Sequence, residues 1–203
     1  MSTNWDDLQA IHLSALQEIG NIGAGNAASA LAQMLNCTIN MAVPKSGVLP
    51  FQDMLKLVGD EEDTVACTYF QINGDVEGSI FFLLSEESAY RLVKLLVGEI
   101  TAENQEMVQS ALQEIGNILT GNFLTAFTQF TRLSLNQSVP ALAFDMLGAV
   151  LSGAMLEGGH WAEKALIIET EFFAEGDSLS GHFFLVPTLE SLEKILKALG
   201  LEI

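Results

Sequence analysis

Positively charged side chains are scarce in this sequence. Its 8 Lys and Arg stand against 26 Asp and Glu, which gives a formal charge of −18 at pH 7. Such a surface repels phosphate backbones, so the charge argues against a nucleic-acid partner. It also opposes docking on an anionic membrane and leaves few cations to hold a free polyphosphate. A partner protein that is locally basic, or that brings its own metal ion, fits this composition better.

Long apolar runs and metal-ligand patterns are also missing. No stretch approaches the ~18–20 uninterrupted apolar residues of a membrane-spanning helix, and the acidic N-terminus lacks the basic region of a signal peptide. Cys37 and Cys67 lie in apolar stretches without metal-ligand spacing, which favours buried, reduced thiols. Neither a P-loop nor a G-x-G-x-x-G occurs. We therefore expect a cytoplasmic protein with no membrane insertion and with no metal or cofactor of its own.

One segment of the chain occurs twice. Residues 14–22 and residues 110–118 both read SALQEIGNI, 96 positions apart. The same register continues to a Gly-Asn pair and a proline in each half, namely Gly25-Asn26 with Pro44 and Gly121-Asn122 with Pro140. Farther on the offset is 102, which places an insertion near the two glycines at 158–159. This repetition indicates an internal duplication.

Each half predicts the same order of elements, α-β-α-β-β-α. Helices are expected at 8–35, 51–58 and 86–97 in the first half and at 103–130, 143–155 and 189–199 in the second. Strands are expected at 38–49 and 134–141, each followed farther on by two strands that pair across a turn, at Asn73-Gly74 and at Glu175-Gly176. Helices segregated from hairpin strands indicate an α+β fold with a mostly antiparallel sheet. Without a flexible linker, we expect one pseudo-two-fold domain over 1–203, made of repeats 8–100 and 104–203.

The repeated segment places polar residues on one side of each long helix. At about 100° per residue, the members of each set fall within about 40° of the serine: Ser14, Glu18, Asn21 and Gly25 in the first helix, and Ser110, Glu114, Asn117 and Gly121 in the second. We call these two sets the first and the second stripe. The core face of the first helix is then expected to hold Ile11, Ala15, Leu16, Ile19 and Ile22.

A polar stripe on a helix is most simply a solvated face. Two observations argue for more. The halves have diverged over most of their length, yet the repeated segment keeps its Gln, Glu and Asn, which core packing alone would not preserve. In addition, Gly25 and Gly121 lie on the stripes, where glycine costs a helix up to ~1 kcal/mol relative to alanine. A missing side chain there would let another backbone approach closely.

The stripe chemistry indicates half of an active site. Glu and Asn are weak nucleophiles with no His or Cys in the motif to activate them, and one carboxylate per stripe is too few for a metal site. An Asn side chain offers one acceptor and two donors, enough to hold and aim a water molecule. Phosphoryl transfer depends on such positioning, and the Glu could pair with a lysine of the partner. The partner would supply phosphate, metal and cation.

The motif resembles a known signature. Ser-x3-Glu-x2-Asn-x22-Pro runs from Ser14 to Pro44 and again from Ser110 to Pro140, and it resembles the signature of the CheC/CheX/FliY phosphatases of bacterial and archaeal chemotaxis. The length of the chain and its two motifs resemble those of CheC proteins most. The resemblance implies a hydrolase acting on the aspartyl phosphate of the response regulator CheY (CheY-P), a two-component signalling protein that carries its own Mg²⁺.

The resemblance also implies roles for the motif residues. Asn21 and Asn117 would orient the hydrolytic water, and Glu18 and Glu114 would engage the regulator's active-site lysine. Ser14 and Ser110 hold the first motif position, where a catalytic role is less clear. Pro44 and Pro140 would shape the strand beside each site. A proline within a strand implies a sheet edge or a bulge.

A second partner follows from the same resemblance, since CheC proteins bind CheD, the receptor glutamine deamidase. The apolar stretch 141–156, with its small residues, suits that binding, with Asp145 as a candidate contact. The alternative for most of its positions is a core helix. The alternative for the whole chain is a non-catalytic adaptor that binds CheD or sits at the flagellar switch.

Overall fold

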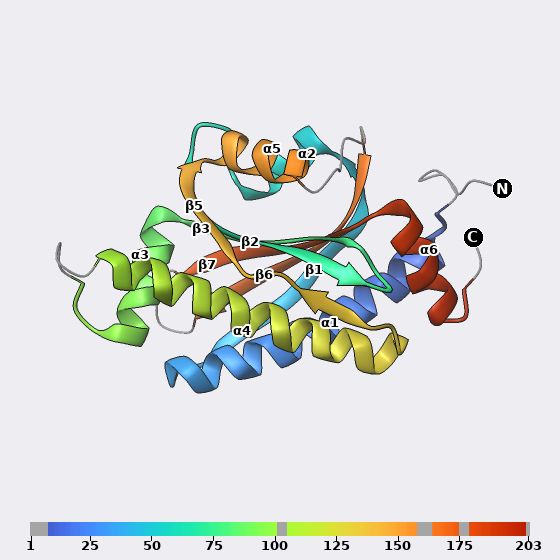
Figure 1. Cartoon of the computed structure of the whole chain (residues 1–203), viewed down its shortest axis with the longest axis horizontal. Coiled ribbons are helices and arrows are strands. Elements are labelled where there is room, and N and C mark those ends of the chain that lie inside the picture. The colour runs from blue at the N-terminus through green and yellow to red at the C-terminus, as the bar shows by residue number, and fades with distance from the viewer. Residues whose placement is uncertain (1–7, 101–104, 158–163, 175–178, 202–203) are drawn as a thin grey trace.

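The computed structural model describes residues 8–100, 105–157, 164–174 and 179–201. The first half of the chain forms α1 (Ala10–Leu35), β1 (Ile39–Pro50), α2 (Phe51–Val58), β2 (Thr64–Gly74), β3 (Gly78–Ser85) and α3 (Glu86–Val97). The second half forms α4 (Gln105–Thr131), β4 (Leu135–Gln137), β5 (Ala141–Met146), α5 (Leu147–Glu157), β6 (Lys164–Ala174), β7 (Ser180–Pro187) and α6 (Leu189–Ala198). The elements build three layers, with the long helices α1 and α4 side by side on one face of a sheet and α2 and α5 on the other (Figure 1).

The seven strands that the structure describes belong to one sheet. Its order is β1-β6-β7-β3-β2-β4, and β5 also pairs with β2. Every pairing is antiparallel. The expected α+β class with a mostly antiparallel sheet is therefore confirmed. Strands of both halves meet in the middle of the sheet, where β3 pairs with β7. The internal duplication and the domain limits remain predictions from the sequence.

The central strands bury side chains on both faces because successive residues point to opposite sides. In β2, Cys67 packs toward α2 and α5, whereas Phe70 packs toward α1 and α4. In β3, Phe81 packs toward α2 and α5, whereas Phe82 packs toward α1 and α4. The larger core lies beneath the long helices, so the helices that carry the two stripes rest on it.

The two motif prolines lie at opposite edges of the sheet. Pro44 is in edge strand β1, where the register shifts between Ala42 and Lys45. Pro140 lies between β4 and β5, which form the other edge by pairing with different parts of β2. A proline cannot donate to a strand ladder, so both positions are ones that the sheet tolerates. The expected edge or bulge is confirmed for Pro44, whereas Pro140 lies between two strands rather than within one.

The expected elements around Pro140 are partly wrong. A strand was expected at 134–141 and a helix at 143–155, but β5 continues to Met146 and α5 begins at Leu147. The backbone of β5 pairs with β2 from Thr64 to Tyr69. That ladder outweighs the helical composition of the segment, because strand formation depends on pairing and burial more than on local propensity.

The closing helices follow the expectation. α3 and α6 are followed by Gly98 and Gly200, whose φ angles of 83° and 77° are left-handed. The expected turn at Glu175-Gly176 and the insertion at 158–159 lie outside the described residues. Over the ranges that the structure does cover, none of the helices combines the length and apolar character that a bilayer crossing needs.

Candidate functional site

Two glycines without a motif role let the long helices pack tightly. A Cβ on Gly23 of α1 would lie 2.6 Å from the Phe123 ring of α4. A Cβ on Gly116 would lie 2.8 Å from Cγ2 of Thr68 in the sheet. A larger residue would push α1 away from α4 at position 23 and α4 away from the sheet at position 116. Close packing therefore explains these two glycines, and it fixes the inner faces of both helices.

The outer faces carry the stripes. All four residues of the first stripe are exposed, and so are Ser110 and Glu114 of the second, whereas Asn117 and Gly121 are half-buried. On the inner face of α1, Leu16 and Ile19 are buried as expected. The expectation for Ile11 is wrong, because its side chain is 59% exposed.

Nothing inside the described part of the molecule requires the stripe glycines. A Cβ on Gly25 would meet no atom within 4 Å, and one on Gly121 would meet Oε1 of Gln137 at 3.8 Å. Neither glycine has a positive φ. The hydroxyl four residues later donates to each glycine carbonyl, at 2.8 Å from Ser29 and 2.7 Å from Thr125. Packing among the described residues therefore does not account for these two glycines.

A segment after α4 lies along the second stripe. The Gln137 amide of β4 donates through Nε2 to the main-chain oxygen of Asn117 at 3.3 Å and also to its Oδ1. The Gln113 amide donates to the Pro140 carbonyl at 3.5 Å. Sequence reasoning missed Gln137 because the motif does not include it. The residue at the equivalent position of the first half, 96 residues earlier, is Met41, which is not polar.

The site has the chemistry of a binding half-site. Across the described ranges, no group of three or more His, Cys, Asp or Glu side chains could hold a metal ion. Burial raises the pKa of the Cys67 thiol to about 12, so it stays protonated at neutral pH and is no thiolate nucleophile. The stripes can therefore donate and accept hydrogen bonds and present two carboxylates. Neither stripe contains a cysteine.

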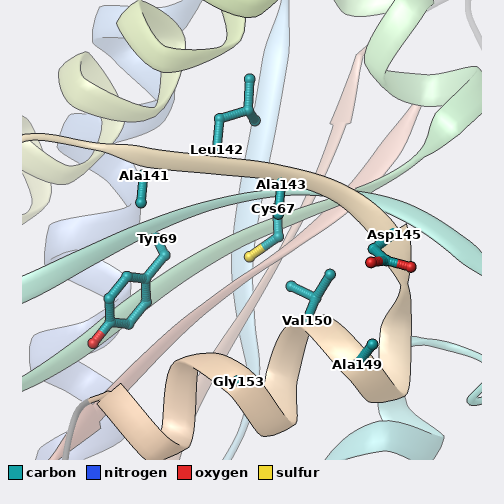
Figure 2. Close-up of a pocket in the computed structure, with 9 residues that line it drawn as sticks. All are labelled: Cys67, Tyr69, Ala141, Leu142, Ala143, Asp145, Ala149, Val150 and Gly153. Atoms are coloured by element: carbon teal, nitrogen blue, oxygen red, sulfur yellow. The ribbon is translucent and has the colours of Figure 1, made fainter.

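Asp145 lies away from the stripes. It is exposed near the end of β5, where its Oδ1 accepts from the amide of Met146 at 2.8 Å. It is thus on a strand, where a helix was expected. Figure 2 shows it at the junction with α5, on the rim of a hollow of about 280 Å³ lined mostly by small and apolar residues, among them Ala143, Val150 and Gly153.

Comparisons with known proteins agree with this description. The model of the CheC-like family matches residues 11–47, and that of the chemotaxis phosphatase CheX matches 66–150. Each match contains one complete motif. The CheY-P phosphatase CheC of Bacillus subtilis is 37% identical over 195 residues, which cover 93% of this chain and 93% of that protein.

Solved structures share the fold. FliY of Thermotoga maritima superimposes with a TM-score of 0.76 at 19% identity, over 96% of this chain and 98% of that one. A chain of the CheX–CheY–BeF3–Mg²⁺ complex from Borrelia burgdorferi gives a TM-score of 0.54 at 23% identity, over 81% and 94% of the two chains. The fold is that of the CheC/CheX/FliY class. The chain belongs to the CheC family.

Proposed function

We propose that this protein is a phosphatase that accelerates hydrolysis of the aspartyl phosphate on a CheY-like response regulator. The observation that carries the proposal is the pair of exposed Glu-Asn stripes on α1 and α4, in a chain of the CheC family. An exposed stripe with no covalent nucleophile suits a partner that brings the reacting group. The acidic surface suits a regulator with a basic docking face.

In this proposal each stripe completes the regulator's active site. Asn21 or Asn117 holds a water molecule in line with the aspartyl phosphate, and the water oxygen attacks phosphorus. The bond to the aspartyl oxygen breaks, so the products are inorganic phosphate, which takes both protons of the water, and a free carboxylate. Glu18 or Glu114 pairs with the regulator's lysine and fixes the docking register. Mg²⁺ on the regulator neutralises charge on the phosphoryl group. This protein's contribution is positioning.

The stripe glycines belong to the docking surface. Gly25 is exposed with open space where a side chain would be, and Gly121 is nearly as open. A regulator backbone can therefore approach the helix beside the asparagine. The cost of glycine in a helix, up to ~1 kcal/mol relative to alanine, is then offset by closer docking. Ser14 and Ser110 lie on the same surface at the first motif position, and Pro44 and Pro140 shape the sheet edges nearby.

Because both motifs are complete, each single asparagine variant is expected to keep part of the activity. Asn21→Ala leaves the second stripe intact, and Asn117→Ala leaves the first. The decay of the phosphorylated regulator, followed by its label or by released phosphate, should remain faster with either variant than without protein. Complete loss from one substitution alone would mean that the stripes do not act as two sites.

A CheD-like deamidase is a second candidate partner. The hollow beside α5 supports it, because its rim combines small residues, which allow close approach, with the exposed carboxylate of Asp145 (Figure 2). Asp145→Arg should weaken binding of the deamidase about tenfold or more, as measured by titration calorimetry, because it replaces an interface charge by its opposite. The same variant should still accelerate loss of regulator phosphate. Unchanged binding of the deamidase would contradict this assignment.

A non-catalytic adaptor, bound to the deamidase or at the flagellar switch, is the alternative from another class. It would explain the fold and the hollow. It gives no reason for the same Glu and Asn at matching positions of both motifs. We therefore favour the phosphatase.

A further inference from the structure

We propose that Gln137 is a positioning residue for Asn117 in the second stripe. The inference rests on the proposed function, because it concerns the asparagine that would aim the hydrolytic water. It adds a residue outside the motif and a difference between the halves that the matching motifs conceal.

The hydrogen bonds define how Asn117 is held. The Gln137 amide nitrogen donates to the main-chain oxygen of Asn117 at 3.3 Å and also contacts its Oδ1. A main-chain oxygen can only accept, so Gln137 must face it with its NH₂ group. The Asn117 side chain must then turn its oxygen toward Gln137, because two NH₂ groups would repel. The Nδ2 donors of Asn117 lie on the other side of the carboxamide, where they can address a water molecule.

Gln137 is itself fixed by the sheet. Its Cα is paired with Ile72 in the ladder of β4 with β2, and its side chain is half-buried. The pairing of β4 with β2 therefore holds the Gln137 amide beside the second stripe. A carboxamide bonded from such a support loses less freedom when water and regulator bind, which is the condition for efficient positioning.

The fold alone gives no reason for glutamine here. Its Oε1 is buried, and within the described residues it accepts no hydrogen bond. Burying an acceptor without a partner is destabilising. Methionine has nearly the same length and shape and would leave no orphaned atom. Met41 holds the corresponding register position, 96 residues earlier. A glutamine at position 137 is explained if its NH₂ group is needed to hold Asn117.

The two stripes consequently differ. Asn117 is half-buried against the Gln137 amide, whereas Asn21 is exposed and position 41 offers no amide. Identical motif residues therefore lie in different surroundings. The contribution of Gln137 is therefore expected at the second stripe alone.

Gln137→Met tests the inference when each stripe acts alone. In the Asn21→Ala protein, where the second stripe remains, Gln137→Met should lower kcat for phosphate release about tenfold with KM for the regulator unchanged. Gln137→Glu keeps the shape but presents only acceptors, so it should lower kcat similarly. In the Asn117→Ala protein, Gln137→Met should change nothing, because its effect passes through Asn117.

Three results would overturn the inference. They are an unchanged kcat in the Asn21→Ala protein, an equal loss in both proteins, and a change in KM alone. Asn136→Ala, at the exposed neighbouring residue of β4, is the matched control and should keep full activity. Side-chain amide NMR signals give a readout independent of turnover, since Asn117→Ala should shift the Gln137 NH₂ signals. If the unsubstituted protein does not accelerate hydrolysis, the proposed function fails, and those signals still decide whether Gln137 holds Asn117.

Discussion

Replacing both stripe asparagines, as Asn21→Ala with Asn117→Ala, is expected to return the decay of the phosphorylated regulator to its unassisted rate. The side chain that aims the water would be gone from both stripes, and neither stripe has another group to replace it. Misplacement of a reacting group by about 1 Å can cost ~100-fold in rate, so removing the positioning group should cost at least that much. The measurement is the rate of phosphate release with excess regulator.

The double variant should remain folded and should still bind the regulator. Asn21 is exposed and Asn117 is half-buried, alanine is a better helix former, and surface substitutions usually change stability by less than ~0.5 kcal/mol. Glu18 and Glu114 still provide the docking charges. We therefore expect loss of turnover without loss of affinity. A double variant that still accelerates hydrolysis would contradict the assigned mechanism.

The chain offers a matched control for this variant. Asn26 and Asn122 are also asparagines at equivalent positions of the same two helices. They lie about 120° around the helix from the stripe serines, and Asn122 donates to the carbonyl of Ile118 at 2.8 Å. Asn26→Ala with Asn122→Ala should leave phosphate release unchanged. An equal loss in this control would show that the asparagines affect the helices in general.

The second large expected effect is on the stability of the helix packing that supports the stripes. Phe123→Ala should lower the free energy of unfolding by about 3–5 kcal/mol, the usual cost of emptying a large aromatic site. Phe123 is fully buried and lies where α1 crosses at Gly23. Its ring centroid is 5.0 Å from that of Phe183, in a tilted contact, and 6.2 Å from that of Phe127, in a stacked one. It thus joins α1, α4 and the sheet. Chemical unfolding followed by circular dichroism gives the measurement.

Phe130→Ala is the control for Phe123→Ala. Phe130 is on the same helix, but it is 55% exposed. Its loss should change the unfolding free energy by less than ~0.5 kcal/mol. If the two substitutions cost the same, the α1–α4 contact does not stabilise the fold as described here.

The sequence predicted the helices well because their signals are local. The long helices are marked by periodic apolar residues, and α3 also by the glycine that follows it. The ends of α2 and α3 match the expected positions. The strand β5 was missed because its evidence is not local. Ala141–Met146 looks helical on its own, and its pairing with β2, more than 70 residues earlier in the chain, decides its conformation.

The candidate site was likewise predictable only where its signals are local. The stripe was predictable because the motif repeats and helix geometry places its residues on one face. Ile11 was assigned to the core face wrongly, because helix geometry places it only about 20° from Glu18 and therefore beside the stripe. Gln137 was missed because its contact with Asn117 joins a strand to a helix 20 residues away, which no motif or periodicity encodes.

The most direct test of the central claim is turnover at low protein concentration. The phosphorylated regulator is mixed with this protein at a molar ratio well below one, and released phosphate is followed until the regulator is exhausted. A phosphatase with two half-sites should release many equivalents of phosphate per molecule. Release that stops after one or two equivalents, or that requires equimolar protein, would contradict catalysis and would favour an adaptor.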